Sequence, residues 1–356
     1  MCKDVLAVIH KFSISGTPVK AVPFGGGHIN KTYKVTTQEE HSADYLLQRI
    51  NHNVFSDVKG LMENIYKVTA HIKKKTALGE EHVLTIVKTR DDKLYYKNGN
   101  GYWRVFEFLK GAQSFDKAQT QKHAFEGARM FGLFLKDLAD FPVGELHITI
   151  KDFHNIDFRL RQFEEALKSA DEDLIEQAAG QIHLVQKYSD LMSGIYNKAV
   201  SGGLPLRVTH NDTKFNNVLL NKDGMGQSVI DLDTVMPGFV FYDVGDGIRT
   251  GVINADEDEQ DLDDVVLDID KYQAYIEGYL DGTGDILTPE ELKSIPYSGA
   301  YMAYIMGVRF LTDYLNGNIY YRVRFPEHNY YRSRCQLYVT SLLLEYTRTI
   351  KSLMKV

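Results

Sequence analysis

The residues best able to do chemistry lie in one polar segment, LRVTHNDTKFNNVLL, at positions 206–220. It contains Asp212, then Lys214 two residues later and Asn217 five residues later. A carboxylate can accept the proton of a hydroxyl nucleophile, and an amide oxygen can bind a hard cation such as Mg²⁺. A lysine at this distance can reach a phosphoryl group. The combination indicates phosphoryl transfer to an oxygen nucleophile.

The spacing of His210, Asp212, Lys214 and Asn217 is also that of the catalytic loop of kinases. Phosphoryl transfer needs little covalent help from a protein, so such a loop has to orient the nucleophile and neutralise charge. We assign Asp212 to the first task and Asn217 to the metal. Taken alone, the segment could instead satisfy only its own backbone, because Asn and Asp are ordinary turn formers.

A second acidic motif, SVIDLDTVMPG, places Asp231 nineteen residues after Asp212, at the end of an apolar strand. This is the position of the second magnesium-binding aspartate in kinases, here with Asp-Leu-Asp in place of Asp-Phe-Gly. Asp231 is therefore predicted to bind metal together with Asn217. Asp233 could be a second metal ligand or a turn-capping group.

Three consecutive glycines, Gly25, Gly26 and Gly27, lie between two strand-like runs in FGGGHINKTY. Glycines in a turn let backbone N–H groups approach phosphates, because no Cβ intervenes. The same glycines could simply form a tight hairpin, and Asn30 replaces the third glycine of the usual G-x-G-x-x-G pattern. By itself His28 is an ordinary polar turn residue.

The chain divides into a strand-rich part, residues 1–110, and a helix-rich part, residues 111–356. The first part should bind nucleotide and consist of an antiparallel sheet with one helix begun by Asp57. The second should be mainly helical and carry the catalytic loop and the acceptor site. The expected strands are 17–24, 29–37, 44–51, 82–90, 93–101 and 102–111, and the helical patterns are 57–75, 118–140, 158–198, 262–281, 289–316 and 330–354. These elements predict an α+β fold with two lobes.

Composition limits the other possibilities. A chain of 356 residues with 44% hydrophobic and 25% charged residues is typical of a folded enzyme. Its net charge of -7 lacks the broad positive field of nucleic-acid-binding proteins. The only cysteines, Cys2 and Cys335, suggest no disulfide framework. With no secretory signal and no apolar run near the ~18 residues that span a bilayer, we expect a cytoplasmic protein without nucleic-acid or membrane partners.

Taken together, these motifs resemble the aminoglycoside phosphotransferase and choline kinase group, which has the protein-kinase-like fold. Within that group the chain is especially similar to bacterial N-acetylhexosamine 1-kinases. The resemblance covers nearly the whole sequence, and its more specific parts lie near the C-terminus. The segments that carry it are GGGHINKTY, LLQRIN, WRVFEF, LRVTHNDTKFNNVLL, IDLDTVMPG, DVGDGIR, RFLTDYLNGNIYY and FPEHN.

The resemblance implies ATP-dependent phosphorylation of the anomeric hydroxyl of N-acetylglucosamine or N-acetylgalactosamine, with Mg²⁺. It makes Asp212 the base and also a substrate contact, and it adds His28, Arg309 and Tyr320 as sugar contacts. Arginine donates a fork of N–H bonds, and tyrosine combines a hydroxyl with an apolar ring. Without the resemblance, Arg309 would be a salt-bridged helix residue and Tyr320 a core aromatic.

One position departs from the kinase pattern. Many kinases have a lysine in the third strand that pairs with the nucleotide phosphates and with a helix glutamate, whereas this chain has Gln48 followed by Arg49. Gln48 is predicted to contact the nucleotide without charge, so that affinity would depend more on magnesium and Lys214, and Glu63 would lack its usual partner. By order along the chain, adenine would bind main chain around residues 107–109.

Two alternatives remain open from the sequence. The chain could be another small-alcohol kinase of the same group, acting on an aminoglycoside, choline or homoserine. A cationic acceptor of that kind would want carboxylates or an aromatic cage. The chain could also be a catalytically silent nucleotide-binding module that keeps the scaffold.

Overall fold

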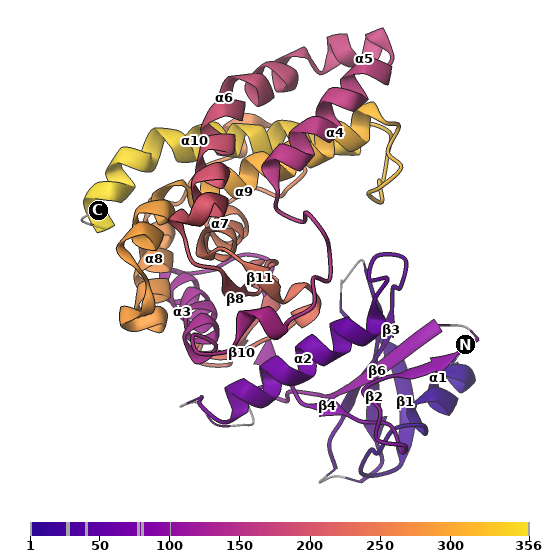
Figure 1. Cartoon of the computed structure of the whole chain (residues 1–356). Coiled ribbons are helices and arrows are strands. Elements are labelled where there is room, and N and C mark those ends of the chain that lie inside the picture. The colour runs from indigo at the N-terminus through magenta and orange to yellow at the C-terminus, as the bar shows by residue number, and fades with distance from the viewer. Residues whose placement is uncertain are drawn as a thin grey trace.

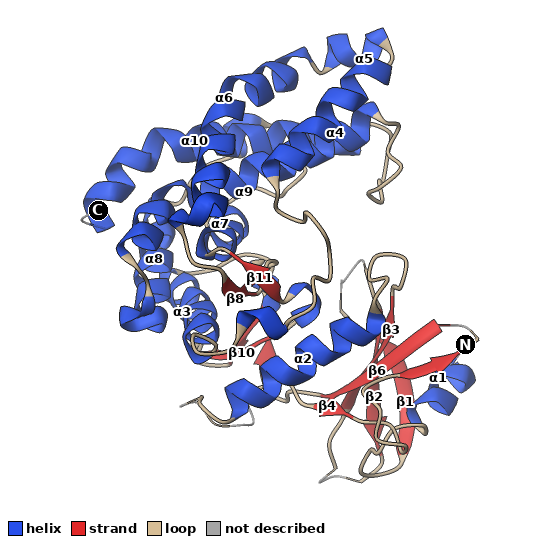
Figure 2. Cartoon of the chain, in the orientation of Figure 1, coloured by secondary structure: helices blue, strands red, loops and turns tan. Residues whose placement is uncertain are grey.

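The computed structural model describes residues 2–25, 29–39, 42–76, 79, 82–99 and 101–354. Figure 1 shows a sheet-bearing N-terminal lobe, which contains α1 (Cys2–Ile9), beside a larger helical C-terminal lobe. The predicted α+β fold is confirmed, with an antiparallel sheet in the first lobe and mostly helices in the second (Figure 2).

The N-terminal sheet has the strand order β1-β2-β3-β6-β4, and β5 pairs with β6. All of these pairings are antiparallel. The strands are β1 (Pro18–Pro23), β2 (Lys31–Thr37), β3 (Tyr45–Ile50), β4 (Ile86–Val87), β5 (Tyr96–Asn98) and β6 (Gly101–Glu107). The run at 82–90 gives only the two residues of β4, so that predicted strand is much shorter than expected.

The two faces of this sheet are covered by different helices. Leu47 and Val105 lie opposite each other on β3 and β6 and pack with Ile9 of α1 in a small core cluster. Because side chains alternate along a strand, the next residues point to the other face, where Phe106 joins the main core with α2 (Val58–Lys73). Asp57 begins α2 as predicted, and its carboxylate accepts the N–H of Gly60 at 2.9 Å.

The C-terminal lobe contains eight α-helices within the described residues. They are α3 (Gln121–Asp137), α4 (Ile156–Ser169), α5 (Glu172–Gln177), α6 (Ala179–Lys198), α7 (Val240–Gly251), α8 (Ile269–Thr283), α9 (Pro289–Leu315) and α10 (His328–Met354). The helical pattern predicted from 158 to 198 is divided into three helices. Ala170 is extended, with ψ 152°, and Asp171 begins α5, whose first turn is acidic as the helix dipole favours.

Short strands flank the predicted catalytic segment within the helical lobe. They form one sheet, in the order β10-β9-β7, and a separate pair, β11-β8. The strands are β7 (Ala112–Gln113), β8 (Arg207–Thr209), β9 (Val218–Asn221), β10 (Gly226–Val229) and β11 (Met236–Gly238). The loop between β8 and β9, residues 210–217, is the predicted catalytic segment.

The lobes share one hydrophobic core. Leu61 and Met62 of α2 belong to the same buried cluster as residues of α3, α7 and α9. Asn64, fully buried in α2, donates to the carbonyl oxygens of His147 and Val235 at 2.8 and 3.0 Å. None of the helices in the described ranges combines the length and apolar character needed to traverse a bilayer.

Candidate active site

Helix α7 fixes the backbone of the 210–217 loop. Asp243, which is 1% exposed, accepts the backbone N–H groups of His210 and Asn211 at 2.8 and 2.7 Å. Asn211 has a left-handed backbone, with φ 64°, and its side-chain amide donates to nearby main-chain carbonyl groups. Such a conformation persists only where the surroundings determine it. Asp212 is therefore presented from a fixed backbone.

Asp212 is an ionised carboxylate beside a cation. Its Oδ1 lies 3.2 Å from Nζ of Lys214. Burial among protein atoms favours the neutral acid, but the neighbouring groups, Lys214 first among them, together outweigh burial and lower the pKa of Asp212. In return, the Asp212 charge raises the pKa of Lys214. At neutral pH this arrangement can accept a proton from a hydroxyl.

The His210 ring connects this loop to the strand end that carries Asp231. Its Nε2 lies 2.8 Å from the carbonyl oxygen of Ile230, and its Nδ1 lies 3.2 Å from the backbone N of Asp212. Because a carbonyl only accepts and a backbone N–H only donates, the ring is the neutral tautomer with hydrogen on Nε2. The loop and the strand end are thereby held together.

The β9-β10 hairpin brings Asn217 and Asp231 to the same end of two paired strands. Asn217 directly precedes β9, and its carbonyl oxygen accepts the N–H of Ile230, the residue before Asp231, at 2.9 Å. The side-chain nitrogen of Asn217 donates to the Asp212 main-chain oxygen at 2.8 Å and to its carboxylate at 3.2 Å. No donor among the described residues bonds to its side-chain oxygen, which is therefore available to a cation.

The chemistry of these side chains suits a magnesium ion. Asp231 is solvent-accessible, but its pKa is raised to about 7. The first cause is partial desolvation by the surrounding protein atoms, and the next are the negative charges of Asp233 and Asp212. A divalent cation would relieve this repulsion between carboxylates. Across the described ranges no cluster of three or more His, Cys, Asp or Glu side chains could hold a metal. One carboxylate and one amide agree with the way Mg²⁺ is usually bound, by few protein groups together with substrate phosphates.

Asp233 takes neither of the two roles considered for it. Its side chain is 4% exposed and forms a salt bridge with Arg104 of β6, in which Arg104 Nη2 donates to Oδ2 at 3.0 Å. The side-chain nitrogen of Asn30 donates to the same oxygen at 2.6 Å. Asp233 therefore binds the N-terminal lobe.

Gln48 is bonded at both ends of its side-chain amide. Its Oε1 accepts from Arg104 Nε at 2.9 Å, and its Nε2 donates to Thr32 Oγ1 at 3.0 Å. These two bonds fix the orientation of the amide and leave the second N–H of Nε2 to donate to a phosphate. Arg49 lies on the opposite face of β3, where its Nε would be 3.0 Å from a Cβ placed on Gly101. Gln48, not Arg49, faces the lobe junction.

The glycine loop is described only in part. Gly25 has φ 76°, a left-handed conformation that favours glycine, and no atom of the described residues lies within 4 Å of the place its Cβ would take. Gly26, Gly27 and His28 lie outside the described residues, so their expected contacts with phosphates and sugar stay predictions.

The segment after β6 offers one main-chain donor for adenine. The backbone N–H groups of Glu107 and Phe108 donate to Thr85 and Asp44 at 3.0 and 2.8 Å. In the portion of the chain that is described, the N–H of Leu109 has no acceptor. Among the N–H groups of residues 107–109, that of Leu109 is therefore the one available to an acceptor nitrogen of adenine in the described structure.

Arg309 and Tyr320 belong to one cluster of arginines and aromatic rings, which we call the arginine cluster: Phe153, Arg159, Arg309, Tyr320 and Tyr321. The Arg309 guanidinium carbon lies 5.3, 6.0 and 5.6 Å from the ring centroids of Phe153, Tyr320 and Tyr321. Arg309 is 8% exposed, whereas Tyr320 is 64% exposed. Tyr320 is therefore not a core aromatic.

Arg159 of α4 is a member of this cluster that the sequence did not reveal. Burial and then the Arg309 charge lower its pKa to about 10. Over the described ranges neither arginine forms a salt bridge with a carboxylate, and Arg159 Nε and the Tyr321 hydroxyl are buried without a hydrogen-bond partner. The cluster is thus prepared for an electronegative group.

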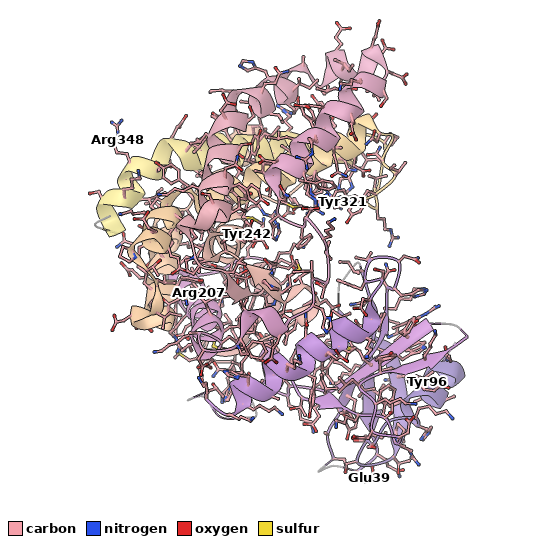
Figure 3. All side chains as sticks on the ribbon, in the orientation of Figure 1. Glu39, Tyr96, Arg207, Tyr242, Tyr321 and Arg348 are labelled. Atoms are coloured by element: carbon pink, nitrogen blue, oxygen red, sulfur yellow. The ribbon has the colours of Figure 1, made fainter. Side chains whose placement is uncertain are left out.

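His154 joins the arginine cluster to the 210–217 loop. Its Nε2 donates to the carbonyl oxygen of Asn211, next to Asp212, at 2.9 Å. Its ring packs against Phe153 of the arginine cluster, with ring centroids 4.3 Å apart, and against Tyr242 at 5.0 Å. Figure 3 labels Tyr242 and the cluster member Tyr321. Burial lowers the pKa of His154 to about 3, so the ring stays neutral.

The acidic run at residues 255–264 forms ion pairs with other parts of the helical lobe. Glu257 pairs with the buried Arg249 at 2.7 Å, and Asp258 lies 3.0 Å from His328 and also pairs with Arg324. The run therefore ties α7 to the start of α10. The predicted helix at 262 begins instead at Ile269.

Glu63 also has a partner outside the kinase pattern. Its Oε2 lies 3.0 Å from Nε2 of His147, in the C-terminal lobe. Gln48 stands where many kinases have the lysine that pairs with this glutamate, and Glu63 instead pairs with His147 across the lobes.

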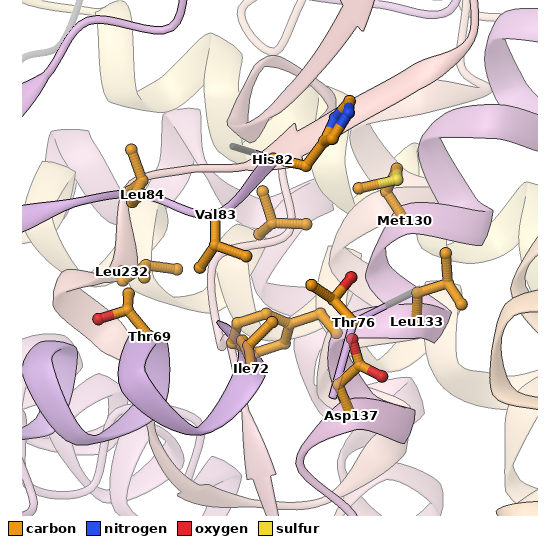
Figure 4. A pocket seen from close by; sticks show the side chains of 12 residues that line it. Thr69, Ile72, Thr76, His82, Val83, Leu84, Met130, Leu133, Asp137 and Leu232 are labelled. Carbon is orange, nitrogen blue, oxygen red and sulfur yellow. The ribbon is translucent and has the colours of Figure 1, made fainter. Parts of the chain in front are cut away.

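A separate apolar pocket lies between α2, α3 and the end of β10 (Figure 4). Ile72, Val83, Leu133 and Leu232 are among the residues that line it, with Asp137 at one side. Burial raises the pKa of Asp137. None of the predicted site residues lines this pocket, so it is distinct from the candidate active site.

Solved structures of similar fold are small-molecule phosphotransferases. An aminoglycoside phosphotransferase from Alicyclobacillus acidocaldarius matches with a TM-score of 0.66 and 12% identity, covering 96% of this chain and 95% of that one. A microcompartment-associated aminopropanol kinase matches with a TM-score of 0.66 and 16% identity, covering 98% of both chains. Choline kinase from Cryptosporidium parvum matches with a TM-score of 0.59 and 15% identity, covering 99% of both. At these identities the likeness shows a common fold.

The sequence profile of the APH group, described as the phosphotransferase enzyme family, matches residues 20–283. This range covers most of the N-terminal sheet, the 210–217 loop, Asp231 and helices α3 to α8. The chain therefore belongs to the phosphotransferase enzyme family.

Proposed function

We propose that the protein is an ATP-dependent kinase that phosphorylates the anomeric hydroxyl of an N-acetylhexosamine, giving the sugar 1-phosphate. The similar spectinomycin phosphotransferase, solved with ADP and spectinomycin, and the amicoumacin kinase, solved with AMP-PNP and Ca²⁺, support a nucleotide donor and a divalent cation. The resemblance of the sequence to N-acetylhexosamine 1-kinases supports the acceptor.

Asp212 would orient the anomeric hydroxyl and receive its proton as the oxygen forms a bond with the γ-phosphorus and the bond to ADP breaks. Lys214, paired with Asp212 at 3.2 Å, would neutralise charge on the transferring group. Asn217 and Asp231 would hold Mg²⁺, which would neutralise charge on the nucleotide phosphates. Gly25, Gly26 and Gly27 would cover the phosphates, with Gln48 behind them.

The arginine cluster supports a neutral sugar over a cationic acceptor. Arg159 and Arg309 lie near one another, as the effect of Arg309 on the pKa of Arg159 indicates, and neither forms a salt bridge with a carboxylate of the described residues, although Asp152 acts on Arg159 from a longer distance. A cationic aminoglycoside or choline would be repelled here. A neutral sugar can instead accept hydrogen bonds from the arginines through hydroxyl or acetamido oxygens, and its apolar face can pack on Tyr320. His28 would complete the sugar contacts.

The direct test is a panel of acceptors with ATP and Mg²⁺, followed by ADP release. N-Acetylglucosamine and N-acetylgalactosamine should give ADP and lose their reducing end, whereas choline, homoserine and kanamycin should give background rates. The matched control is methyl N-acetylglucosaminide, because its anomeric oxygen carries a methyl group and has no proton to transfer.

Turnover of the methyl glycoside at the rate of the free sugar would contradict phosphorylation at the anomeric oxygen. Preference for choline or an aminoglycoside would contradict the sugar acceptor. ATP binding with no ADP release from any acceptor would favour the catalytically silent module.

A further inference from the structure

Three polar side chains form a row across the N-terminal sheet. Thr32 of β2 lies opposite Gln48 of β3, which lies opposite Arg104 of β6. Cross-strand neighbours share a face of the sheet, and these three are joined by hydrogen bonds, Arg104 to Gln48 at 2.9 Å and Gln48 to Thr32 at 3.0 Å. The row fixes the direction of the Arg104 guanidinium.

Arg104 extends this row into the other lobe. Its side chain is 2% exposed, and it pairs through Nη1 and Nη2 with both carboxylate oxygens of Asp233, which is 4% exposed. Asn30, next to the glycine loop, donates to the same carboxylate at 2.6 Å and accepts the N–H of Asn51 at 3.0 Å. Asp233 is thus held from two places in the N-terminal lobe.

The turn that contains Asp233 begins at the candidate metal ligand. Asp231 has a left-handed backbone, with φ 58° and ψ 57°, directly before the short 3-10 turn Leu232–Thr234. A non-glycine residue in this conformation is strained and needs support from its surroundings. The C-terminal lobe holds Thr234, whose hydroxyl donates to the carbonyl oxygen of His210 at 2.7 Å. Asp233 connects the same turn to the N-terminal lobe through Arg104 and Asn30.

We propose that Arg104 is a positioning residue, which through Asp233 holds Asp231 in its metal-binding conformation and in register with the glycine loop. This inference rests on the proposed function only in taking Asp231 as a ligand of Mg²⁺. It explains why the third strand has Gln48: the glutamine orients an arginine that serves the metal side of the site. Residues behind metal ligands in this way typically change metal affinity by about 10–100-fold when replaced.

The test removes the ion pair between Arg104 and Asp233 without leaving an unpaired buried charge. The double variant Arg104→Met, Asp233→Leu replaces the ion pair by apolar side chains, an exchange that often leaves stability nearly unchanged. The measurement is the affinity for AMP-PNP by calorimetry, with and without Mg²⁺. We expect the gain in affinity that Mg²⁺ confers on the wild type to fall about 10–100-fold, while the metal-free affinity stays within about twofold.

The matched control is the double variant Arg207→Met, Glu291→Leu, which removes a second two-bond ion pair, with a fully buried glutamate and a partly buried arginine, away from the metal site. This variant should keep the wild-type gain from Mg²⁺. An undiminished gain in the Arg104→Met, Asp233→Leu protein, shown by circular dichroism to be folded, would overturn the proposal. If that protein does not fold, Asp233→Asn serves instead, and an unchanged gain there has the same meaning.

No acceptor is present in this experiment. A wild type that binds AMP-PNP more tightly with Mg²⁺ but phosphorylates no N-acetylhexosamine would refute the proposed acceptor and leave this inference standing. A wild type without any gain from Mg²⁺ would refute the role of Asp231 and this inference with it.

Discussion

Asp212 obtains its chemistry from a small set of neighbours. Lys214 keeps its carboxylate ionised, and Asn217 donates to it from the side that is proposed to face the metal. These contacts are polar, and none of them packs the Asp212 side chain against the hydrophobic core. Its charge can therefore be removed with little effect on the core.

We predict that Asp212→Asn lowers kcat by about 10²–10⁴-fold, the usual contribution of a general base. The melting temperature should stay close to that of the wild type, because the isosteric amide keeps the loop backbone bonds to Asp243. Steady-state kinetics and thermal melting check both. Asp223→Asn, at an exposed turn, is the control and should keep full activity; wild-type turnover by the Asp212 variant would remove it as the base.

Arg309 is predicted to bind the acceptor and not the nucleotide. Arg309→Met removes a charged donor whose bonds to a substrate are each worth about 1.5–3 kcal/mol. The KM for N-acetylhexosamine should rise tenfold or more, by order of magnitude, with the KM for ATP unchanged. Arg161→Met, which removes an exposed arginine of the same lobe, should alter neither constant. A rise in the KM for ATP alone would contradict this assignment.

Helix α7 acts as the support of the 210–217 loop through Asp243. This carboxylate is buried, and burial raises its pKa to about 6 even though two backbone N–H groups donate to it. The unfolded chain releases the same proton near its ordinary pKa of 3.8. The folded protein therefore binds the proton more tightly than the unfolded chain does.

The stability that depends on Asp243 is predicted to fall as the pH rises from about 4 to about 6, and to level off above that range. The change could reach about 3 kcal/mol, because each pKa unit corresponds to about 1.4 kcal/mol. Urea unfolding of wild type and Asp243→Asn over this range should show the difference in unfolding free energy, wild type minus variant, decreasing with pH. Asp264→Asn, on an exposed loop, should show a constant difference. A wild-type advantage that grows with pH would contradict the raised pKa.

The molecule as a whole is held together by a core that does not stop at the lobe boundary. Strand β6 contributes Trp103 and Val105 to the cluster under α1, and Phe106 to the main core that continues through α2 into the helical lobe. Asn64, Arg104 and Asn30 add polar bonds between the lobes. Neither lobe can lose its packing without exposing part of the other.

We therefore predict that the two lobes unfold together. Trp103 is the single tryptophan and lies in the N-terminal sheet, so its fluorescence reports that lobe, whereas the far-ultraviolet circular dichroism signal reports mainly the helical lobe. The urea transitions of the two signals should coincide. A fluorescence transition at clearly lower urea would show that the N-terminal lobe unfolds independently.

Local signals made much of this structure predictable. The capping Asp57 and the apolar period after it gave the helix α2, and glycine turns between β-branched runs gave the sheet. The break at Ala170 was missed, because alanine favours helix and the period continues across it. The Arg104 and Asp233 pair joins residues 129 positions apart, and no spacing rule relates them. Arg159 looked like any surface helix residue, since only the fold buries it beside Arg309.

The bonded row of Thr32, Gln48 and Arg104 also limits how the sequence can drift. Introducing the usual kinase lysine by Gln48→Lys would put a second cation against a buried guanidinium and remove the acceptor of its Nε bond. Restoring that lysine would become tolerable only after Arg104 and Asp233 had both been replaced. A single substitution therefore cannot convert the arrangement with Gln48, Arg104 and Asp233 into the arrangement with a lysine in the third strand. Relatives should carry one arrangement or the other.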